Sequence, residues 1–334
     1  MPRIAINGFG RIGRTVFKIG YGQSGFDVVA INDLTETETL ASLLRLDSAY
    51  GRFDATIAAR KQSLVVDGHA VPVFAEKDPA ALPWKKLGVD VVLECTGRFT
   101  DLESASAHLT AGAKRVIISA PAKGDDIPTY LLGVNDAALK KETHAIINNA
   151  SCTTNCAAPV TTVLHEAFGI KKAILSTVHA YTADQNLQDG PHRDLRRARA
   201  AAFNIVPTST GAAIAVTEVV PALKGKFGGL ALRVPVLTGS LMQCVYLFKR
   251  RVTVAQVNAA FVKASKMPRW KNILAVSNEP LVSSDCIGSS LSATVDLGLT
   301  MVVDGDLVQV VAWYDNEWGY ANRLAELALR FGRV

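Results

Sequence analysis

The feature that most constrains this chain is a glycine-rich turn between a short apolar strand and a helix. Ile4-Ala5-Ile6 predicts the strand, Gly8, Gly10 and Gly13 follow in the pattern G-x-G-x-x-G, and Arg11 to Gly20 has helical apolar spacing. The first glycine permits a tight turn, the second lets the backbone approach a pyrophosphate, and the third allows close helix–strand packing. This order predicts a Rossmann dinucleotide-binding domain with phosphates at the helix N-terminus.

An acidic residue stands where this type of domain binds the ribose of its cofactor. The predicted strand Phe26 to Ile31 is followed by Asp33, twenty residues beyond Gly13. A carboxylate there can accept hydrogen bonds from both ribose hydroxyls and would repel the 2′-phosphate of NADP. Taken alone, Asp33 could equally be a turn residue that bonds the backbone at Thr35 to Thr37. With the glycine pattern, it predicts NAD as the cofactor.

The sequence texture changes in the middle of the chain. In the first half, continuous apolar runs such as Val89 to Leu93 and Arg115 to Ile118 are typical of a parallel sheet covered on both faces. After Asn149, a helix is expected over Cys152 to Phe168, although Pro159 should kink it or end its first turns. Long β-type runs follow, including Ala173 to Val178, Ala231 to Val236 and Gln243 to Phe248.

These patterns predict an α/β protein of two domains, which suits a length of 334 residues. The first is a Rossmann doubly wound parallel-sheet NAD domain over residues 1–150, completed by a C-terminal helix over residues 316–334. The second is an α+β catalytic domain with a mostly antiparallel or mixed sheet over residues 151–315.

The composition excludes several classes of protein. With 49% hydrophobic and 20% charged residues the chain is globular, and its net charge of +6 is scattered, so nucleic acid is not expected as a primary partner. Five cysteines do not suggest a disulfide framework, and no apolar run reaches the length of a membrane span. The chain runs from Met1 directly into a strand, leaving no room for a signal peptide. We therefore expect a cytoplasmic protein with no membrane partner.

Cys152 is the strongest candidate nucleophile. It opens the predicted second-half helix within Ala150 to Cys156, where the helix dipole favours the thiolate and a nearby imidazolium would favour it further. The Ser-x-Thr-Thr-Asn residues around it are polar and are not typical of a hydrophobic core. Cys156, one helical turn on, is better interpreted as a packed core residue. The sequence offers no further ligands that would make the two cysteines a metal site. His179 ends an apolar run and can emerge at a sheet edge. Spacing alone cannot pair it with Cys152, and a cysteine hydrolase would fit equally well.

A basic segment and a hydroxyl-rich segment together predict an anion site. His192 to Arg199 is short and strongly basic, and Ser209 to Ala213 brings hydroxyls and a glycine to the start of a helix. Guanidinium, hydroxyl and free N–H donors are the elements of a phosphate site. A solvated loop or an interface segment is the alternative for some of these arginines. Arg233 lies inside a β run and needs a partner, for which a ligand anion is a candidate.

Essentially the whole chain resembles the phosphorylating, NAD-dependent glyceraldehyde-3-phosphate dehydrogenase family. The hexapeptide Ser151 to Cys156 is the most specific of the shared motifs. The others are Asn7 to Arg14, Ile31 to Asp33, Glu94 to Gly97, Ser119 to Pro121, Ser176 to Thr182, the arginine-rich loop, Ser209 to Ala213 and Ala312 to Tyr320.

The resemblance implies an activity and a set of site residues. Glyceraldehyde 3-phosphate would be oxidised with NAD and inorganic phosphate to 1,3-bisphosphoglycerate, in glycolysis or gluconeogenesis, through a hemithioacetal and a thioester on Cys152, with His179 as its partner. The implied NAD contacts are Gly8, Gly10, Arg11, Ile12, Asp33, Lys77, Thr96, Ser119 and Asn316, although family members often have arginine at the position of Lys77. The implied contacts to substrate or inorganic phosphate are Ser151, Thr153, Thr182, Asp184, Arg197, Thr210, Gly211 and Arg233. The family is usually a homotetramer whose arginine-rich loop borders a neighbour's cofactor, and no metal is implied.

Three other hypotheses remain. Erythrose-4-phosphate dehydrogenase is a relative of similar layout, but its Ser-Thr-Gly-Ala-Ala segment is usually altered, whereas Ser209 to Ala213 is intact here. Members that use NADP typically have residues such as Thr-Gly-Gly after the acidic position, whereas Asp33 is followed by Leu34-Thr35-Glu36. A protein that binds RNA or protein partners through its Rossmann domain is a third possibility, but the presence of every catalytic residue favours catalysis as the primary role.

Overall fold

The computed structural model describes residues 1–141 and 143–334, which form two compact units. The first unit comprises Met1–Tyr130, Asn135–Ala150 and Ala321–Val334, and the second comprises Leu131–Val134 and Ser151–Tyr320. Among the residues described, no helix has both the length and the apolar character needed to cross a membrane.

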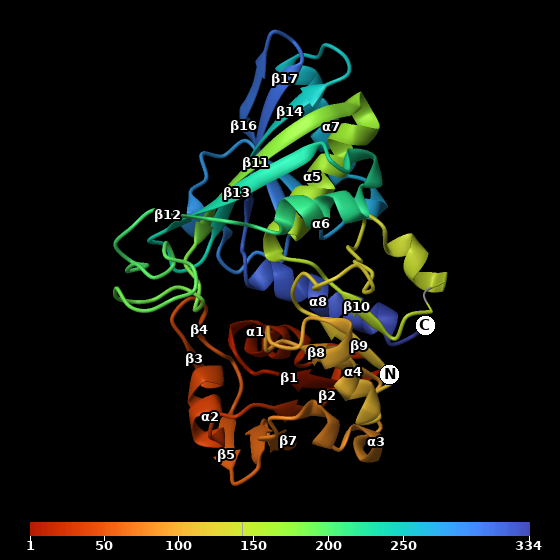
Figure 1. Ribbon diagram of the computed structural model, residues 1–334, viewed down its shortest axis with the longest axis vertical. Coiled ribbons are helices and arrows are strands. Elements are labelled where there is room, and N and C mark those ends of the chain that lie inside the picture. The colour runs from red at the N-terminus through yellow and green to blue at the C-terminus, as the bar shows by residue number, and fades with distance from the viewer. Residues whose placement is uncertain (142) are drawn as a thin grey trace. The chain divides into compact units, whose positions relative to one another are not determined.

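The first unit is built on an eight-stranded sheet in the order β10-β9-β8-β1-β2-β7-β6-β5 (Figure 1). The pairs from β10 to β7 are parallel, and the last two pairs are antiparallel. Its strands are β1 (Arg3–Asn7), β2 (Asp27–Asn32), β5 (Ile57–Arg60), β6 (Ser63–Val66), β7 (His69–Phe74), β8 (Val91–Glu94), β9 (Arg115–Ile118) and β10 (Ile146–Asn148), with β3 (Leu46–Asp47) and β4 (Gly51–Arg52) as a separate hairpin. Its helices are α1 (Arg11–Gly20), α2 (Thr37–Arg45), α3 (Trp84–Leu87) and α4 (Leu102–Thr110).

This sheet is doubly wound, as the sequence predicts. The chain leaves β1 through α1 for β2 on one side, and β8 pairs with β1 on the other side, so the strand order reverses at β1. Every residue of β8 is buried, which shows that both faces of that strand are covered. Open α/β sheets bind ligands at the carboxyl ends of the strands where the order reverses. The end of β1 is therefore the expected place for a nucleotide.

The glycine turn after β1 is required by close contacts. Gly8 has a φ of +91°, and a Cβ atom there would lie 2.7 Å from the backbone nitrogen of Thr96. A Cβ atom on Gly13 would lie 2.1 Å from the carbonyl oxygen of Gly8. The first glycine thus permits the backbone conformation, and the third lets α1 pack on the turn. The helix α1 has the predicted bounds, Arg11–Gly20.

The second unit is built on a mixed seven-stranded sheet in the order β12-β13-β11-β14-β17-β16-β15. Four of its pairs are antiparallel, while β11–β13 and β15–β16 are parallel. This confirms the predicted α+β character. Its strands are β11 (Ile170–Ala180), β12 (Val206–Thr208), β13 (Phe227–Val234), β14 (Ser240–Phe248), β15 (Leu274–Ser277), β16 (Ala293–Val303) and β17 (Leu307–Tyr314). Its helices are α5 (Cys152–Phe168), α6 (Ala212–Val219) and α7 (Val254–Ser265).

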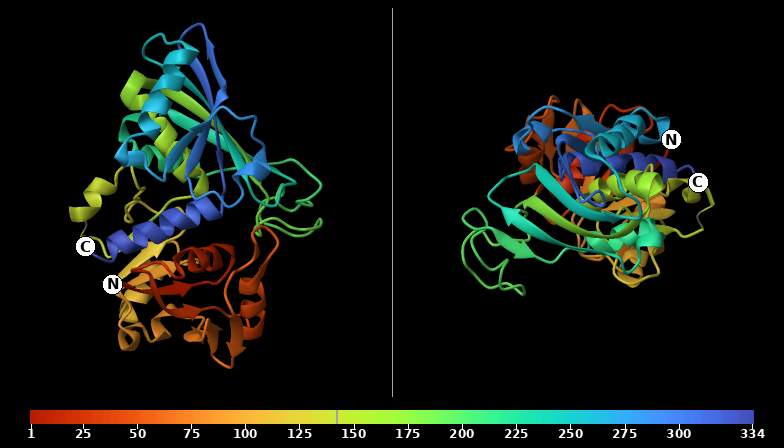
Figure 2. Two further views of the ribbon diagram at one scale, coloured as in Figure 1. Left: turned by 180° about the vertical axis from the view of Figure 1, so that it is seen from behind. Right: turned by 90° about the horizontal axis from the view of Figure 1, so that it is seen from above.

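One face of this sheet is covered by helices of the same unit. Along β14, the side chains alternate between buried residues and half-buried residues, and α5, α6 and α7 all pack on the sheet. Figures 1 and 2 show these three helices gathered on one side of the strands. The other face leaves apolar side chains partly exposed, including Ile174 and Leu230.

The structure refines three expectations about element boundaries. Helix α5 has the expected bounds, Cys152–Phe168, and Pro159 does not end it, because the residues around Pro159 are buried and tertiary packing outweighs the hydrogen bond that a proline lacks. Strand β11 ends at Ala180, one residue beyond His179, where the sequence places its end. Helix α8 (Trp318–Phe331) begins two residues later than predicted, because the Asp315 carboxylate accepts hydrogen bonds from the N–H groups of Glu317 and Trp318.

Candidate active site

The candidate nucleophile, Cys152, is the first residue of α5. Ser151 is the N-cap, and its hydroxyl accepts a hydrogen bond of 3.0 Å from the Thr154 N–H. Ala150, just before the cap, has a left-handed backbone with a φ of +52°, which is uncommon for a residue with a side chain. The half-buried thiol therefore stands at a capped helix N-terminus that follows a strained residue.

The neighbouring strands β11 and β13 bring a histidine and an arginine to this thiol. The Nε2 atom of His179 lies 3.3 Å from the Cys152 Sγ atom. In the parallel register of β11 and β13, His179 is the direct partner of Arg233. The Arg233 Nη1 atom lies 3.0 Å from the His179 Nδ1 atom and donates a 3.0 Å hydrogen bond to the Ala180 carbonyl. The three predicted residues thus meet through sheet pairing.

Hydrogen bonding assigns the tautomer of His179. Its Nδ1 atom lies 2.7 Å from the Ala180 carbonyl oxygen, which can only accept a hydrogen bond. The shorter of the two Nδ1 contacts, to this carbonyl, favours the tautomer with the proton on Nδ1; Arg233, 3.0 Å from Nδ1, then donates to the same carbonyl and not to the ring. The Nε2 atom is left with a lone pair facing the Cys152 thiol. This is the arrangement that a general base needs.

Burial and the charge of Arg233 dominate the electrostatics of the site. Burial, together with the Arg233 charge, lowers the pKa of His179 to about 3, so the imidazole is neutral at physiological pH. Burial raises the pKa of the Cys152 thiol, while the Arg233 charge and the N–H groups of Thr153 and Cys152 lower it. Arg233, and not an imidazolium, supplies the positive charge that favours the thiolate.

Tyr314 is a member of this site that sequence reasoning did not single out. Its hydroxyl lies 2.9 Å from the Thr153 hydroxyl and 2.8 Å from the Thr177 hydroxyl, and its ring lies edge-on to His179. Tyr314 comes from β17. Only one strand, β14, lies between β17 and β11 in the sheet, so the Tyr314 side chain reaches these residues. Local sequence patterns do not predict the order of strands in a sheet, so they could not predict that Tyr314 lies beside Thr153 and His179.

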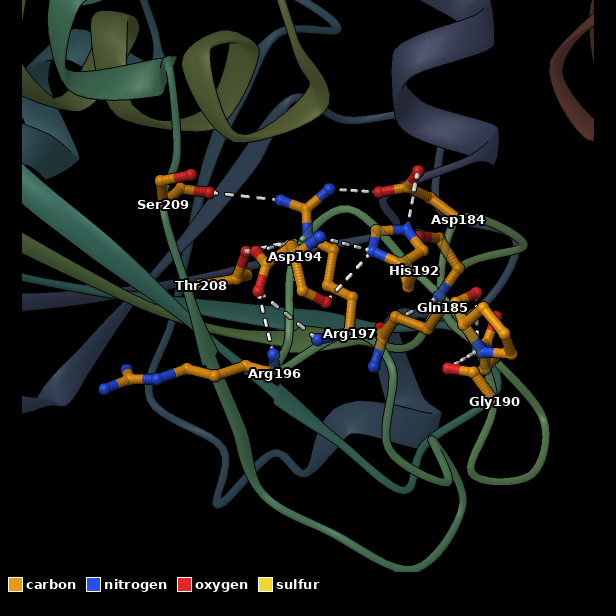
Figure 3. Close-up of polar contacts among 12 residues, drawn as sticks. Asp184, Gln185, Gly190, His192, Asp194, Arg196, Arg197, Thr208 and Ser209 are labelled. Carbon is orange, nitrogen blue, oxygen red and sulfur yellow. Dashed lines mark hydrogen bonds and ion pairs between the residues drawn. The ribbon is translucent and has the colours of Figure 1, made fainter.

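The predicted anion residues Asp184 and Arg197 lie side by side on the loop between β11 and β12 (Figure 3). The Arg197 guanidinium bonds the Asp184 carboxylate, donates to the Thr208 hydroxyl at 2.8 Å and reaches the Ser209 carbonyl at 3.4 Å. His192 lies beside Asp184, with 3.9 Å between Nε2 and the carboxylate. Arg197 and Asp184 also act electrostatically on Arg233, which connects this cluster to the thiol.

The remaining predicted phosphate residues are distributed around α5, α6 and β11. Gly211 is the exposed N-cap of α6, and the Thr210 hydroxyl accepts a hydrogen bond of 3.1 Å from the Ala212 N–H. The Thr182 N–H donates to the Gln185 side chain at 3.3 Å. The Thr153 hydroxyl is buried against Tyr314. Helices α5 and α6 pack together within the second unit.

A separate pocket of about 480 Å³ lies at the carboxyl ends of the strands of the first unit. Five predicted cofactor residues line it: Gly8, Gly10, Asp33, Lys77 and Thr96. The Asp33 carboxylate accepts hydrogen bonds from the N–H groups of Phe9, at 2.7 Å, and Thr35, at 2.9 Å. Both roles weighed for Asp33 therefore coincide, because it stabilises its turn and also faces the pocket.

The other predicted cofactor residues do not line that pocket. Arg11 and Ile12 lie in the first turn of α1, and the Arg11 guanidinium pairs with Asp47 at 2.9 Å. Ser119 forms a side-chain hydrogen bond with the Cys95 thiol. In the second unit, the side-chain oxygen of Asn316 accepts hydrogen bonds from the Ser240 hydroxyl and the Gly239 N–H. Within the described residues, no group of three acidic, cysteine or histidine side chains could hold a metal ion.

Comparison with known proteins adds a further observation. A domain family described as "Glyceraldehyde 3-phosphate dehydrogenase, NAD binding domain" matches residues 2–102, and "Glyceraldehyde 3-phosphate dehydrogenase, C-terminal domain" matches residues 151–316. The glyceraldehyde-3-phosphate dehydrogenase of Geobacillus stearothermophilus is 54% identical over 326 residues, which is 98% of this chain and 97% of the relative. Glyceraldehyde-3-phosphate dehydrogenase 1 of Bacillus cereus is 52% identical over 328 residues, and the Borreliella burgdorferi enzyme is 51% identical over 332 residues, each covering 98% of both chains.

Proposed function

Because the chain belongs to the glyceraldehyde-3-phosphate dehydrogenase family, we propose that Cys152 is its nucleophile and His179 its general base. The chain is an NAD-dependent oxidoreductase of glycolysis that converts glyceraldehyde 3-phosphate and phosphate into 1,3-bisphosphoglycerate. The 3.3 Å distance between the thiol sulfur and the His179 Nε2 atom is the observation that carries the assignment of roles.

The first unit has the features that NAD requires. The pocket is open at Gly10, where a Cβ atom would meet nothing within 4 Å, so the backbone can approach a pyrophosphate. Asp33 offers carboxylate oxygens to a ribose, and Lys77 brings a positive charge to the pocket lining. We assign cofactor binding to Gly8, Gly10, Asp33, Lys77 and Thr96 on this basis. When bound, NAD supplies a hydride acceptor.

Cys152 and His179 together convert the aldehyde to a thioester. As the Cys152 Sγ atom attacks the carbonyl carbon, the His179 Nε2 atom takes the thiol proton and returns it to the carbonyl oxygen, giving a hemithioacetal. The Cys152 N–H at the helix N-terminus is placed to stabilise that oxygen while it is charged. Nε2 then accepts the hydroxyl proton as the carbon loses its hydride, which leaves the thioester on Sγ.

Arg233, Arg197 and the hydroxyl groups near them bind the phosphates. Arg233 lies 3.0 Å from the His179 Nδ1 atom, and its charge acts on the Cys152 thiol and on Arg197, which supports a site for an anion near Sγ. In this proposal inorganic phosphate, held with the help of Ser151, Thr153, Thr210 and Gly211, attacks the thioester carbon, and Thr182 and Asp184 lie around the substrate phosphate. The C–S bond breaks, the acyl phosphate forms, and the thiolate recovers its proton from the protonated Nε2 atom of His179.

Steady-state NADH formation tests the substrate assignment. The purified enzyme is assayed with glyceraldehyde 3-phosphate and with erythrose 4-phosphate, each with and without inorganic phosphate. We expect kcat/KM to be highest for glyceraldehyde 3-phosphate and turnover to depend on phosphate. A higher kcat/KM for erythrose 4-phosphate, or turnover that does not need phosphate, would contradict the assignment.

We also propose that the enzyme is a homotetramer. The sheet face of the second unit that its own helices leave uncovered exposes Ile174, Leu230 and Leu307, beside a groove of about 430 Å³. On the loop between β11 and β12, Leu195 and Phe203 are more than four-fifths exposed. Apolar surface of this extent is typical of an interface between subunits. Light scattering after size-exclusion chromatography measures the subunit number, and a monomer at micromolar concentration would contradict this proposal.

The cytoplasm is the compartment that suits this chemistry. All five cysteines are free, and the reaction requires the Cys152 thiol in its reduced form. Fractionation of cells that express the tagged chain would show its compartment, and recovery outside the cytoplasm would contradict the proposal.

A further inference from the structure

A buried hydrogen-bond network lies behind the pocket of the first unit. Glu94, the last residue of β8, and His108 of α4 both have side chains that are 0% exposed, and the Oε2 and Nε2 atoms lie 3.1 Å apart. A buried carboxylate is costly unless hydrogen bonds satisfy it, and a pair at this depth is poor evidence of stabilisation by itself. The other partners of Glu94 indicate what the pair does.

The two shorter contacts of His108, both 3.1 Å, agree on one tautomer; the 3.4 Å approach of the Asn7 Nδ2 atom to Nε2 is then not a hydrogen bond. The Trp84 indole nitrogen lies 3.1 Å from the His108 Nδ1 atom. An indole N–H can only donate, so Nδ1 accepts, and the neutral ring carries its proton on Nε2. His108 therefore donates to Glu94, and a second proton on Nδ1 would oppose the Trp84 N–H.

The Glu94 carboxylate accepts hydrogen bonds from residues at the ends of two strands. Its Oε2 atom also accepts a hydrogen bond of 2.5 Å from the Asn7 side chain at the end of β1. Its Oε1 atom accepts one of 2.8 Å from the Thr96 N–H and another from the Thr96 hydroxyl. That hydroxyl in turn accepts a hydrogen bond of 3.1 Å from the Arg98 N–H. Both carboxylate oxygens are thus satisfied by directional donors.

The network continues from Asn7 to two more strands. The Asn32 side chain, at the end of β2, donates to the Asn7 side-chain oxygen at 2.7 Å. The Asn32 side-chain oxygen accepts from the Glu76 N–H at 2.9 Å, just beyond β7. The strands β8, β1, β2 and β7 are consecutive neighbours in the sheet. One set of hydrogen bonds therefore joins the carboxyl ends of four adjacent strands.

These strand ends form the pocket. Asn7, Asn32, Glu76, Thr96 and Arg98 all line it, and Phe99, another lining residue, lies edge-on to the His108 ring. We propose that Glu94 and His108 are positioning residues for the cofactor, which they serve by fixing the strand ends that form its pocket. This inference rests on the proposed function, because the pocket is assigned to NAD there.

The test compares His108→Leu with His108→Gln in the full-length enzyme. Leucine removes both hydrogen bonds, whereas glutamine keeps a donor for Glu94 and an acceptor for Trp84. We expect the Kd for NAD, measured by calorimetry, to rise about tenfold in His108→Leu and to stay within about threefold of wild type in His108→Gln. The KM for NAD should rise in parallel in His108→Leu, with kcat at saturating NAD within about twofold of wild type.

A matched control separates positioning from general destabilisation. Thr161→Val removes a buried hydrogen bond of 3.0 Å to Tyr246 in the second unit, so it should lower the melting temperature without changing the Kd for NAD. An unchanged Kd in folded His108→Leu, or an equal loss in both His108 variants, would overturn the inference. If His108→Leu does not fold, Glu94→Gln replaces it, with the same expected rise in Kd. Failure of the wild-type enzyme to bind NAD would instead overturn the proposed function.

Discussion

The Cys152 Sγ atom lies 3.3 Å from the His179 Nε2 atom, although 27 positions separate the two residues in the chain. The thiol belongs to a helix N-terminus and the imidazole to a strand, so tertiary packing alone creates the pair. Arg233 bonds the Ala180 carbonyl beside the imidazole and lowers the pKa of both His179 and Cys152. In this site, Arg233 therefore carries the positive charge, and His179 is the candidate base.

The first prediction concerns Arg233. Replacing it by methionine removes a charge that lowers the pKa of the Cys152 thiol, so the thiolate fraction at neutral pH should fall. The rate of Cys152 alkylation by iodoacetamide at pH 7 should drop several-fold, and its pH profile should move to higher pH. Arg233→Lys keeps the charge and is the control. An unchanged pH profile in Arg233→Met would show that the guanidinium does not act on the thiol.

The second prediction concerns His179 and the pH dependence of stability. Its pKa is about 3 in the folded protein and 6.5 in a model compound, so the unfolded chain binds a proton there first as the pH falls. The free energy of unfolding should therefore decrease below pH 6.5, with a contribution from His179 of up to about 1.4 kcal/mol per pH unit.

Urea denaturation at several pH values and one protein concentration measures this contribution. His179→Gln should lose stability less steeply than wild type between pH 6.5 and pH 4. The exposed His69 is the control position, and His69→Gln should follow the wild-type curve. Parallel curves for His179→Gln and wild type would contradict a depressed pKa for His179.

The third prediction concerns the choice of cofactor. Asp33→Ser removes a carboxylate that faces the pocket, together with its repulsion of a 2′-phosphate. Hydrogen bonds to a charged group contribute about 1.5–3 kcal/mol, so kcat/KM for NAD should fall roughly 10- to 100-fold. The value for NADP should rise or stay constant. Steady-state kinetics with both cofactors measure the ratio, and an unchanged preference for NAD would place the selectivity elsewhere.

The fourth prediction concerns Tyr314. Its phenol bridges the hydroxyls of Thr153 and Thr177, and all three side chains are buried. Tyr314→Phe should lower the free energy of unfolding by about 1–2 kcal/mol, because two buried hydroxyls lose a partner. Denaturant titration of the wild type and the variant measures the difference. A variant as stable as wild type would show that these hydroxyls find other partners.

Local patterns predicted the fold class and much of the first unit. The glycine turn gave α1 its bounds because its causes are local: a φ of +91° at Gly8 and close packing at Gly13. The span of α5 was predicted, but the sequence did not show that Pro159 would leave it uninterrupted, since the burial of the surrounding helix is decided by packing from other elements.

The candidate catalytic residues could be identified from the sequence, but their electrostatics could not. Cys152 and His179 were found through a specific hexapeptide and a family resemblance, whereas their 3.3 Å contact depends on the packing of a helix N-terminus against a strand. The sequence showed neither the burial of His179 nor the register that places Arg233 beside it. Likewise, the sequence does not indicate the role proposed for His108, because its partners Trp84 and Glu94 come from separate segments.

The most direct test of the account is a single-turnover experiment without phosphate. The enzyme is mixed with NAD and glyceraldehyde 3-phosphate, NADH is followed by rapid mixing, and the acid-quenched protein is digested for mass spectrometry. We predict a burst of about one NADH per subunit, one acyl group on the peptide that contains Cys152, and release of that group when phosphate is added. Cys152→Ser, with NAD affinity unchanged, should show neither burst nor adduct. A burst of normal size in Cys152→Ser, or an acyl group on another residue, would contradict the assignment of Cys152 as the nucleophile.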